Sequence, residues 1–150
     1  TVCSVALHED GKLIASTINQ KEKSHSKYVT LMVEEVSQAV EDAHASAKEN
    51  GINSCSFMQG KVEERISEFK KQDIETIILD PPRKGCSMKV LQAVAEISPK
   101  QIIYISCNPS TFARDLGRLE GYSIKDIVVI DLFPQTQHVE TAVLLTASDP

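Results

Sequence analysis

The sequence lacks any long apolar segment, although it has 150 residues and 41% of them are hydrophobic. No stretch approaches the about 18 apolar residues needed to span a membrane, so we expect no membrane partner. The N-terminus has no basic-then-apolar signal segment. The chain begins at Thr1 rather than Met, which indicates a fragment or a processed protein.

Paired cysteines are also absent. The four cysteines are Cys3, Cys55, Cys86 and Cys107, and none of them lies in a C-x-x-C motif. This spacing gives little support to a zinc or iron–sulfur site, and we expect no metal. Four cysteines at this chain length also make a disulfide framework a poor expectation. Reduced thiols in a cytoplasmic protein are the better interpretation.

The sequence has no strong excess of basic residues. Its net charge of −5 argues against a strongly basic nucleic-acid binder. The charge is uneven, however: residues 31–70 carry eight acids and four bases, whereas residues 81–125 carry three acids and seven bases. The more basic part could face phosphate groups. An ordinary solvated surface explains the same numbers.

One domain is the natural expectation for a chain of this length and composition. Residues 2–7 and 13–18 are strand-like runs around the polar loop "HEDGK", which predicts a β-hairpin. From about residue 27 to residue 50 the apolar residues recur at helical spacing, and Gly51 supplies a stop.

After Gly51 the pattern alternates between strand and helix. Strands are predicted at 55–59, 76–80 and 101–106, and helices at 62–70, 88–97 and 109–119. Two β-rich runs, 125–133 and 138–147, follow without a helix between them. This order predicts an α/β fold with a mostly parallel sheet and an antiparallel C-terminal edge.

Two of the predicted strands end in chemically capable residues. Ligands bind beyond the carboxyl ends of strands in open parallel sheets. Asp80 ends the first such strand and precedes two prolines, which make a rigid loop. Cys107 follows the second and precedes Pro109, a residue well suited to the first turn of a helix. A structural turn with a capping Asp80 is an equally good reading of the first motif alone.

Cys107 has two interpretations. Helix N-termini favour negative charge, so the place of Cys107 before a helix favours a nucleophilic thiolate. Most free cysteines are instead buried small apolar residues, which is the better reading of this motif by itself. Near the C-terminus, His138 and Glu140 lie at the start of the last β-rich run, 138–147. Glu140 could act as a base, and a metal site there finds no further ligand cluster in the sequence.

Three motifs in one order carry a specific resemblance. "DPPRKGC", "ISCNPSTFARDL" and "DLFPQTQHVE" closely resemble the RNA 5-methyluridine methyltransferase family, and the similarity covers about residues 38–147. It includes "AVEDAHASAKENGI", which is similar to the helix after the family's second strand. The resemblance implies a Rossmann-like methyltransferase sheet, S-adenosylmethionine as methyl donor, and tRNA or rRNA as the substrate.

The resemblance also implies roles for individual residues. Carbon 5 of uracil is a poor nucleophile, and addition of a thiolate to carbon 6 activates it for attack on the methyl group. By resemblance Cys107 is the nucleophile, and Glu140 is the base that removes the carbon 5 proton. Asp80 and Glu34 are assigned to the donor pocket, with Glu35 as the alternative to Glu34. The resemblance assigns substrate binding to three residues: Arg83, Asn108 and His138.

Glycine is scarce where the family needs it. The family has a glycine-rich donor loop after its first strand, but this chain has six glycines and no G-x-G motif. Only Gly11 precedes the long predicted helix. The family's N-terminal RNA-binding barrel has no counterpart here either.

Residues 1–38 resemble another family. "VCSVALHEDGKLIAS" and "HSKYVTLMVEEV" are similar to the start of TsaB, a family of threonylcarbamoyl-adenosine tRNA modification. The two resemblances meet near "VEEVSQAVEDA". They indicate a chimeric single domain with a TsaB-like part at 1–38 and an incomplete methyltransferase part at 39–150.

Three functions are compatible with these features. The first is an RNA (uracil-5-)-methyltransferase that uses a Cys107 adduct. The second is an inactive or truncated methyltransferase-like scaffold that retains the motifs, and the missing glycine loop favours it. The third is a partner-binding module that docks another tRNA-modification protein through the TsaB-like segment.

Overall fold

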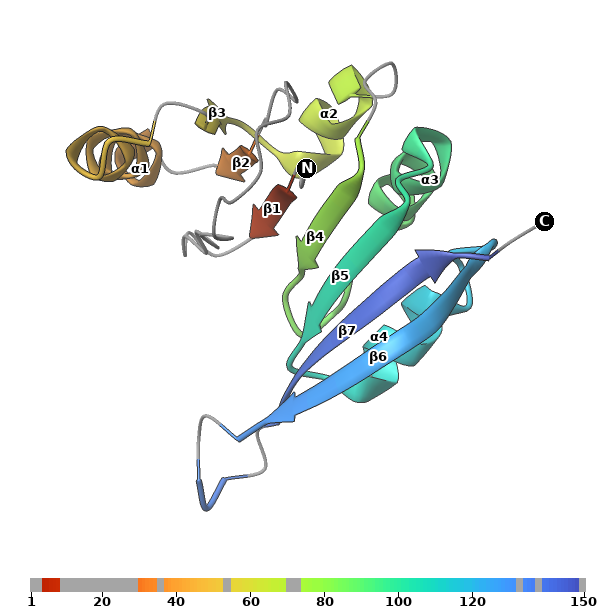
Figure 1. Ribbon diagram of the computed structural model, residues 1–150. Helices are drawn as coiled ribbons and strands as arrows, with labels where there is room; N and C mark the ends of the chain where they lie inside the picture. The colour runs from red at the N-terminus through yellow and green to blue at the C-terminus, as the bar shows by residue number, and fades with distance from the viewer. Residues whose placement is uncertain are drawn as a thin grey trace.

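The computed structural model describes residues 4–8, 30–34, 37–52, 55–69, 74–131, 134–136 and 139–148. Within these ranges the chain forms one seven-stranded sheet with helices packed against it (Figure 1). The elements in chain order are β1 (Ser4–His8), β2 (Thr30–Glu34), α1 (Ser37–Glu49), β3 (Cys55–Gln59), α2 (Val62–Arg65), a 3₁₀ turn (Ile66–Phe69), β4 (Thr76–Asp80), α3 (Met88–Ile97), β5 (Gln101–Ser106), α4 (Pro109–Leu116), β6 (Tyr122–Ile130) and β7 (Glu140–Ala147).

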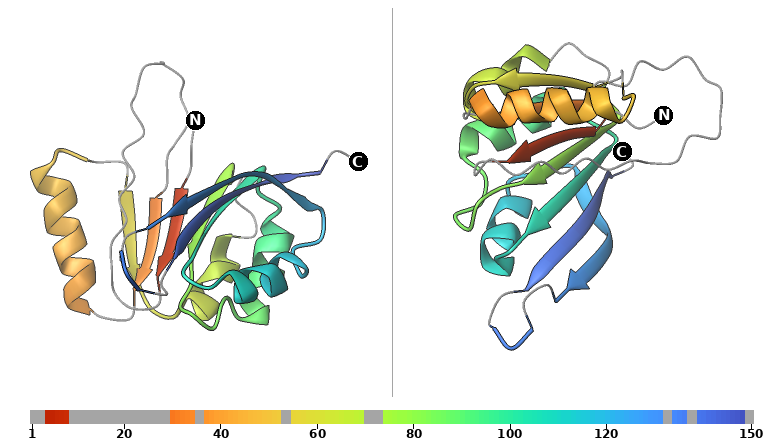
Figure 2. Two further views of the ribbon diagram at one scale, coloured as in Figure 1. Left: turned by 90° about the horizontal axis from the view of Figure 1, so that it is seen from below. Right: turned by 90° about the vertical axis from the view of Figure 1, so that its left-hand side faces the viewer.

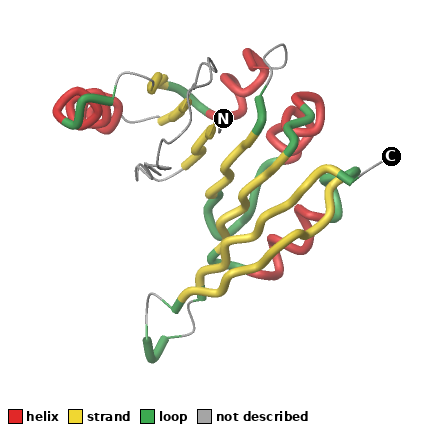
Figure 3. The backbone as a smooth tube through the Cα atoms, in the orientation of Figure 1, coloured by secondary structure: helices red, strands yellow, loops and turns green. Residues whose placement is uncertain are grey.

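The strands lie in the order β3-β2-β1-β4-β5-β7-β6. β3, β2, β1, β4 and β5 pair in parallel, whereas β7 pairs antiparallel with both β5 and β6. The predicted α/β fold with an antiparallel C-terminal edge is therefore confirmed. Figure 3 shows these strands side by side, with β6 and β7 as the longest pair.

The N-terminal predictions need correction. β1 pairs in parallel with β2 on one edge and with β4 on the other, so it is a central strand and not the first arm of a hairpin. Both edges of β1 are therefore paired along the sheet, and residues 13–18 lie outside the described residues. The long helix predicted from residue 27 is also wrong at its start, because residues 30–34 form β2 and α1 begins at Ser37. Continuous apolar runs such as "TLMV" are typical of buried parallel strands.

The later elements follow the sequence closely. The strands predicted at 55–59, 76–80 and 101–106 and the helix at 88–97 have the predicted bounds. The helix predicted from Pro109 ends earlier, at Leu116, with Gly117 as its C-cap. Ser87 caps α3 by accepting a hydrogen bond from the Val90 amide, and Asn108 caps α4 in the same way. Such caps satisfy amide groups that have no partner within the helix.

The core lies on one face of the sheet, and Figure 2 shows the helices around it. Buried side chains from α3, α4 and the 3₁₀ turn pack against alternate residues of β4, β5 and β7, namely Ile77, Leu79, Ile102, Tyr104, Val143 and Leu145. At the other end of the sheet, Met58 packs against the same core, whereas its neighbour Phe57 contacts His44 of α1. Since neighbouring strand residues point to opposite faces, α1 covers the second face beside β3. No described helix is long and apolar enough to cross a membrane.

Candidate active site at the carboxyl ends of the strands

Three of the residues predicted to form the site lie at one edge of the sheet. Asp80 is the last residue of β4, Cys107 directly follows β5, and Glu140 is the first residue of β7. Because β4 and β5 are parallel and β7 is antiparallel to β5, the two strands end where the third begins (Figure 1). The fold therefore brings these three residues to the edge at which open α/β sheets bind ligands.

The pairing of β5 with β7 brings Glu140 towards Cys107. Ser106 pairs with Thr141 at the end of the ladder, so Cys107 and Glu140 are the next residues outward on the two strands. Opposite residues in antiparallel strands have Cα atoms about 4.5–5.5 Å apart. Glu140 is held on its other side by pairing with Ile130 of β6. A carboxylate fixed in this way is within reach of a group bound beside the thiol.

Strand alternation assigns the site to the face opposite α3 and α4. Leu79 and Val143 point into the core beneath these helices. Asp80 lies one residue from Leu79 and Glu140 three residues from Val143, and both separations are odd. Their side chains therefore point to the other face of the sheet. Asp80, Cys107 and Glu140 are all half-buried, so they are accessible to a ligand.

Hydrogen bonds from two hydroxyl groups hold the turn that carries Cys107. The Ser106 hydroxyl accepts a hydrogen bond from the Asn108 amide over 3.1 Å and donates one to the Asn108 carbonyl over 2.9 Å. The Thr141 hydroxyl donates to the Ser106 carbonyl over 3.0 Å. Ser106 is buried, and Thr141 lies beside it on the core face of the sheet. The backbone on both sides of Cys107 is thus held from the core.

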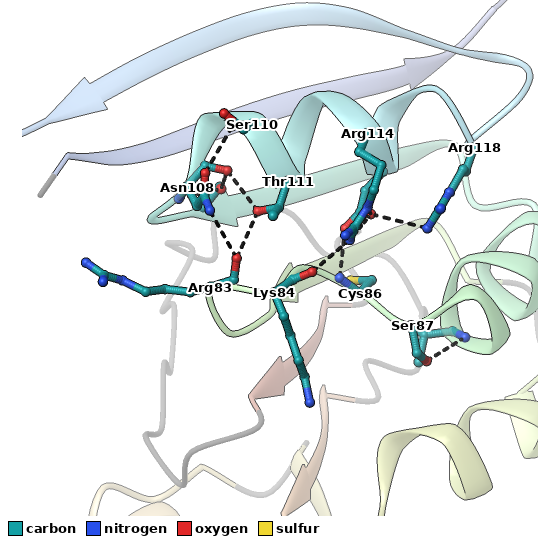
Figure 4. Close-up of polar contacts among 12 residues, drawn as sticks. Arg83, Lys84, Cys86, Ser87, Asn108, Ser110, Thr111, Arg114 and Arg118 are labelled. Carbon is teal, nitrogen blue, oxygen red and sulfur yellow. Dashed lines mark hydrogen bonds and ion pairs between the residues drawn. The ribbon is translucent and has the colours of Figure 1, made fainter.

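The loop after Asp80 is fastened to the start of α4. Asn108 Oδ1 caps the helix by accepting from the Ser110 amide over 3.1 Å, while its Nδ2 donates to the Arg83 carbonyl over 3.2 Å. The Thr111 hydroxyl lies 3.1 Å from the same carbonyl. Figure 4 shows this carbonyl facing α4 while the exposed Arg83 side chain extends away from the helix. The Arg83 carbonyl therefore joins the loop to the start of α4.

A second contact between the loop after Asp80 and α4 is made by the buried carboxylate of Asp115. Its Oδ2 accepts hydrogen bonds from the Cys86 amide over 2.7 Å and from the Tyr104 hydroxyl over 2.6 Å. Its Oδ1 accepts from Nη2 of Arg114 over 2.6 Å, and the same guanidinium nitrogen donates to the Lys84 carbonyl over 2.8 Å (Figure 4). A buried charge is tolerable when it is paired and hydrogen-bonded in this way.

The buried surroundings of Tyr104 change the pKa of its phenol. Burial of its side chain raises the pKa of Tyr104 above its ordinary value, and the neighbouring Cys86 and Asp115 raise it further. The phenol is therefore a hydrogen-bond donor to Asp115 throughout the neutral range. It stabilises the attachment of β5 to α4 and takes no part in proton transfer at the strand ends.

Gly85 allows the loop to approach α4 closely. It has φ of +78°, and a Cβ at this position would lie only 2.5 Å from Arg114 Nη2 and from Asp115 Oδ2. Only glycine combines this backbone conformation with the space available. The "RKGC" segment is thus shaped by its contact with the Arg114–Asp115 pair.

The remaining predicted site residues differ in how far the structure describes them. Glu34 ends β2, and its backbone pairs with Gln59 at the carboxyl edge of the sheet. Its position at a strand end corrects the prediction of a helix there. Glu35 and His138 lie outside the described residues. No group of three or more His, Cys, Asp or Glu residues in the described ranges is placed to hold a metal ion.

Sequence reasoning missed four residues that shape the site, namely Ser106, Thr141, Arg114 and Asp115. Ser106, Arg114 and Asp115 lie within the motif "ISCNPSTFARDL", from which the family resemblance implies no role for them. The adjacent acid and base in "ARD" and the glycine in "RKGC" were the available signals for the α4 attachment. Nothing local marks Thr141, because its partner is 35 residues away.

Comparison with known proteins identifies the family. The model of the family described as tRNA (uracil-5-)-methyltransferase matches residues 14–148. The chain belongs to this family. The sequence resemblance to RNA 5-methyluridine methyltransferases is thereby confirmed.

Curated relatives in the family are RNA methyltransferases. One from Clostridium acetobutylicum is 46% identical over 121 residues, which are 78% of this chain and 26% of the relative. One from Staphylococcus aureus is 46% identical over 123 residues, 80% of this chain and 27% of the relative. The chain thus spans about a quarter of the length of the curated relatives that it matches.

A solved structure in the family has the same arrangement of the chain. The Pyrococcus abyssi tRNA (uracil-54, C5)-methyltransferase, solved in complex with S-adenosyl-L-homocysteine, is 32% identical with a TM-score of 0.69, over 79% of this chain and 29% of that one. The Bacillus subtilis m1A22 tRNA methyltransferase TrmK is 17% identical with a TM-score of 0.61, over 80% of this chain and 50% of that one, and shows likeness of fold alone. The fold is therefore the one found in S-adenosylmethionine-dependent methyltransferases.

The resemblance of residues 1–38 to TsaB finds no support. The family match begins at residue 14 and so includes most of that segment. β1 and β2, which come from the same segment, pair with each other, and β1 also pairs with β4 while β2 pairs with β3. Gly11 follows β1 in the sequence, where the family places its donor loop, and residues 9–29 lie outside the described residues.

Proposed function

We propose that this chain carries the catalytic part of an RNA (uracil-5-)-methyltransferase, which methylates carbon 5 of a uridine in tRNA or rRNA. The observation that carries the proposal is the placement of Cys107 and Glu140 as the next residues outward from the Ser106–Thr141 pair. A reaction that needs a nucleophile and a base on one uracil ring requires such closeness. Family membership and the tRNA-directed Pyrococcus abyssi relative support the same chemistry.

The methyl donor fits the carboxyl edge of the sheet. Glu34 ends β2 and Asp80 ends β4, and these two strands flank β1. A carboxylate at a strand end in this type of fold can accept hydrogen bonds from ribose hydroxyls. We assign Glu34 to the donor ribose and Asp80 to the boundary between donor and uracil. S-adenosylmethionine, when bound, supplies the methyl group that carbon 5 receives.

Cys107 and Glu140 have different roles on the uracil ring, as nucleophile and as base. The Cys107 thiolate forms a bond to carbon 6, and the electron pair of the ring double bond becomes available at carbon 5. After carbon 5 has been methylated, Glu140 removes its remaining proton. The electrons of that C–H bond restore the double bond, the sulfur–carbon bond breaks, and the thiolate leaves. The proton remains on Glu140 and passes to solvent.

The neighbouring polar residues are assigned to RNA. Arg83 is exposed, and its side chain extends away from α4 (Figure 4), so it suits a phosphate or the uracil ring. Asn108 holds the Arg83 carbonyl and the first turn of α4, and we assign it to the substrate through this placement. We assign His138 to the substrate on the family motif alone.

Covalent trapping tests the proposal. RNA that contains 5-fluorouridine, mixed with the chain and S-adenosylmethionine, should form a protein–RNA adduct that survives denaturing electrophoresis. Fluorine replaces the proton that Glu140 must remove, so the thiol cannot be released. Cys107→Ala should abolish the adduct, whereas Cys55→Ala, in β3 at the other end of the sheet, should form it like the parent.

Two results would overturn the proposal. An adduct of equal yield with Cys107→Ala would remove Cys107 from its role. No adduct with the parent chain, under conditions in which a full-length relative forms one, would show that this chain is a methyltransferase-like scaffold.

A further inference from the structure

The two peptide groups on either side of Cys107 are both held by hydroxyl groups. The peptide between residues 106 and 107 presents the Ser106 carbonyl, which accepts a hydrogen bond from the Thr141 hydroxyl over 3.0 Å. The peptide between residues 107 and 108 presents the Asn108 amide, which donates to the Ser106 hydroxyl over 3.1 Å. Cys107 thus lies between two peptide planes that are both held by hydrogen bonds.

Fixing both planes fixes the backbone of Cys107. A peptide group is planar, so a residue has only two soft backbone angles, and each is a rotation against one flanking plane. The Thr141 bond restrains the plane before Cys107 and the Ser106 bond restrains the plane after it. With both restrained, the direction of the Cα–Cβ bond is set, and only the side-chain rotation of the thiol remains free.

Thr141 also connects the backbone at Cys107 to Glu140. It follows Glu140 directly in β7, and its backbone pairs with Ser106 at the end of the ladder. Its side chain lies on the core face of the sheet, whereas Glu140 points to the opposite face. One residue therefore sets the place of the carboxylate through its backbone and the place of the thiol through its hydroxyl.

We propose that the Thr141 hydroxyl is a positioning group that holds Cys107 at a fixed distance and direction from Glu140. The catalytic part of this inference rests on the proposed function, because it assumes that both residues act on one uracil. The structural part, that the hydroxyl restrains the Cys107 backbone, stands without it. Thr141 acts through the Ser106 carbonyl and through its own backbone.

A substrate-free experiment tests the structural part. Thr141→Val keeps the shape and strand preference of threonine but removes the donor, and Thr141→Ser keeps the donor. Thr146→Val makes the same exchange at the other end of β7. In each folded variant, the rate at which chloroacetamide alkylates Cys107 is measured by peptide mass spectrometry, with Cys86 in the same molecule as internal reference.

The half-buried thiol should react faster when its turn opens more often. We expect Thr141→Val to raise the Cys107 alkylation rate about threefold to tenfold, the factor that one neutral hydrogen bond contributes to an opening equilibrium. The rate at Cys86 should stay within about twofold, as should both rates in Thr141→Ser and Thr146→Val. An unchanged Cys107 rate in Thr141→Val would overturn the inference.

Methyl-transfer kinetics test the catalytic part. With uridine RNA and S-adenosylmethionine, Thr141→Val should lower kcat about tenfold while both KM values stay within about twofold, because binding groups are untouched and only the relation of thiol to base is loosened. Thr141→Ser should recover the parent kcat. The concentration of competent sites is counted from the 5-fluorouridine adduct, so lost folding cannot mimic the effect.

The two sets of measurements separate the possible failures. Faster alkylation with unchanged kcat would overturn the catalytic role of Thr141 and leave the proposed function standing. An adduct that persists in Cys107→Ala would overturn the proposed function, while the alkylation rates would still decide whether Thr141 restrains the turn. Equal loss of kcat in Thr141→Val and Thr146→Val would show a general defect of β7 and overturn the inference.

Discussion

Tyr104 donates a hydrogen bond over 2.6 Å to Oδ2 of Asp115, and both side chains are fully buried. The same oxygen accepts from the Cys86 amide over 2.7 Å. Tyr104 belongs to β5, Asp115 to α4 and Cys86 to the loop that follows Asp80. One carboxylate therefore joins the strand that leads to Cys107, the helix that follows it, and the loop that follows Asp80.

Tyr104→Phe should change the response of stability to alkaline pH. Because burial raises the pKa of Tyr104, the folded chain keeps this proton at pH values at which the unfolded chain, with an ordinary pKa of 10.0, loses it. The stabilisation is complete below pH 10 and decreases as the pH rises above that value. Denaturant titrations between pH 9 and 11.5 should show a decrease for the parent that is steeper, by up to about 1.4 kcal/mol per pH unit, than the decrease for Tyr104→Phe. The variant keeps the contribution of Tyr122, whose pKa burial also raises. Equal slopes would contradict the assignment.

Asp115→Asn should destabilise the fold strongly. An amide has no charge to pair with the Arg114 guanidinium, and its NH₂ group would face either that cation or the donors that now bind Oδ2. Leaving the Cys86 amide or the Tyr104 hydroxyl without its acceptor costs about 1–3 kcal/mol in free energy of unfolding. Asp42→Asn on the exposed surface of α1, where Gln38 is the side-chain partner, should change stability by about 0.5 kcal/mol or less. Urea denaturation of both variants measures the difference, and equal effects would show that the buried carboxylate is dispensable.

Gly85→Ala and Gly121→Ala form a matched pair. Both glycines have positive φ, +78° and +83°, so both substitutions carry the backbone strain of alanine, about 1–2 kcal/mol. A Cβ on Gly121 meets nothing within 4 Å, whereas one on Gly85 would overlap Arg114 and Asp115. Gly85→Ala should therefore cost about 1–3 kcal/mol more than Gly121→Ala, as overpacking in a close contact does. Similar midpoints of thermal unfolding would mean that the loop moves away from α4 at no cost.

Local sequence patterns predicted the second half of the fold well. The strands at 76–80 and 101–106 are short apolar runs between clear turn signals, and the helix at 88–97 has apolar residues at helical spacing after a capping serine. The prediction of a helix at residues 30–34 was wrong because the short segment "TLMVEEV" fits both a helix and a buried strand. Its pairing with β1 and β3, which no local pattern reveals, decides in favour of the strand.

The site could be predicted only as a set of residues. The motifs named Asp80, Cys107 and Glu140, and the register of β5 and β7 then brought two of them to adjacent positions. The supporting contacts were beyond reach, because they join residues distant in sequence: 29 positions separate Cys86 from Asp115, and 35 separate Ser106 from Thr141. Hydrogen bonds of this kind are a property of the packed sheet and helix rather than of any segment.

Glu140→Gln should separate the two halves of the proposed reaction. The amide keeps the size and the backbone position of the glutamate, so Cys107 should still add to carbon 6 and carbon 5 should still be methylated. Without a base to remove the carbon 5 proton, the sulfur–carbon bond should persist. Ordinary uridine RNA should then give a lasting, methylated adduct with Glu140→Gln, which the parent releases within its turnover time.

The control variant changes a glutamate outside the proposed site. Glu120→Gln, an exposed residue just before β6, should release its RNA like the parent. Labelling the donor methyl group distinguishes the outcomes, because the adduct of Glu140→Gln should carry the label in a one-to-one ratio with RNA. An unlabelled adduct would show that the thiol adds to carbon 6 without Glu140 and that the residue is needed for methyl transfer itself. No adduct together with normal turnover would exclude Glu140 as the base and direct the search to other acids at the carboxyl edge, of which Asp80 at the end of β4 is the first to test.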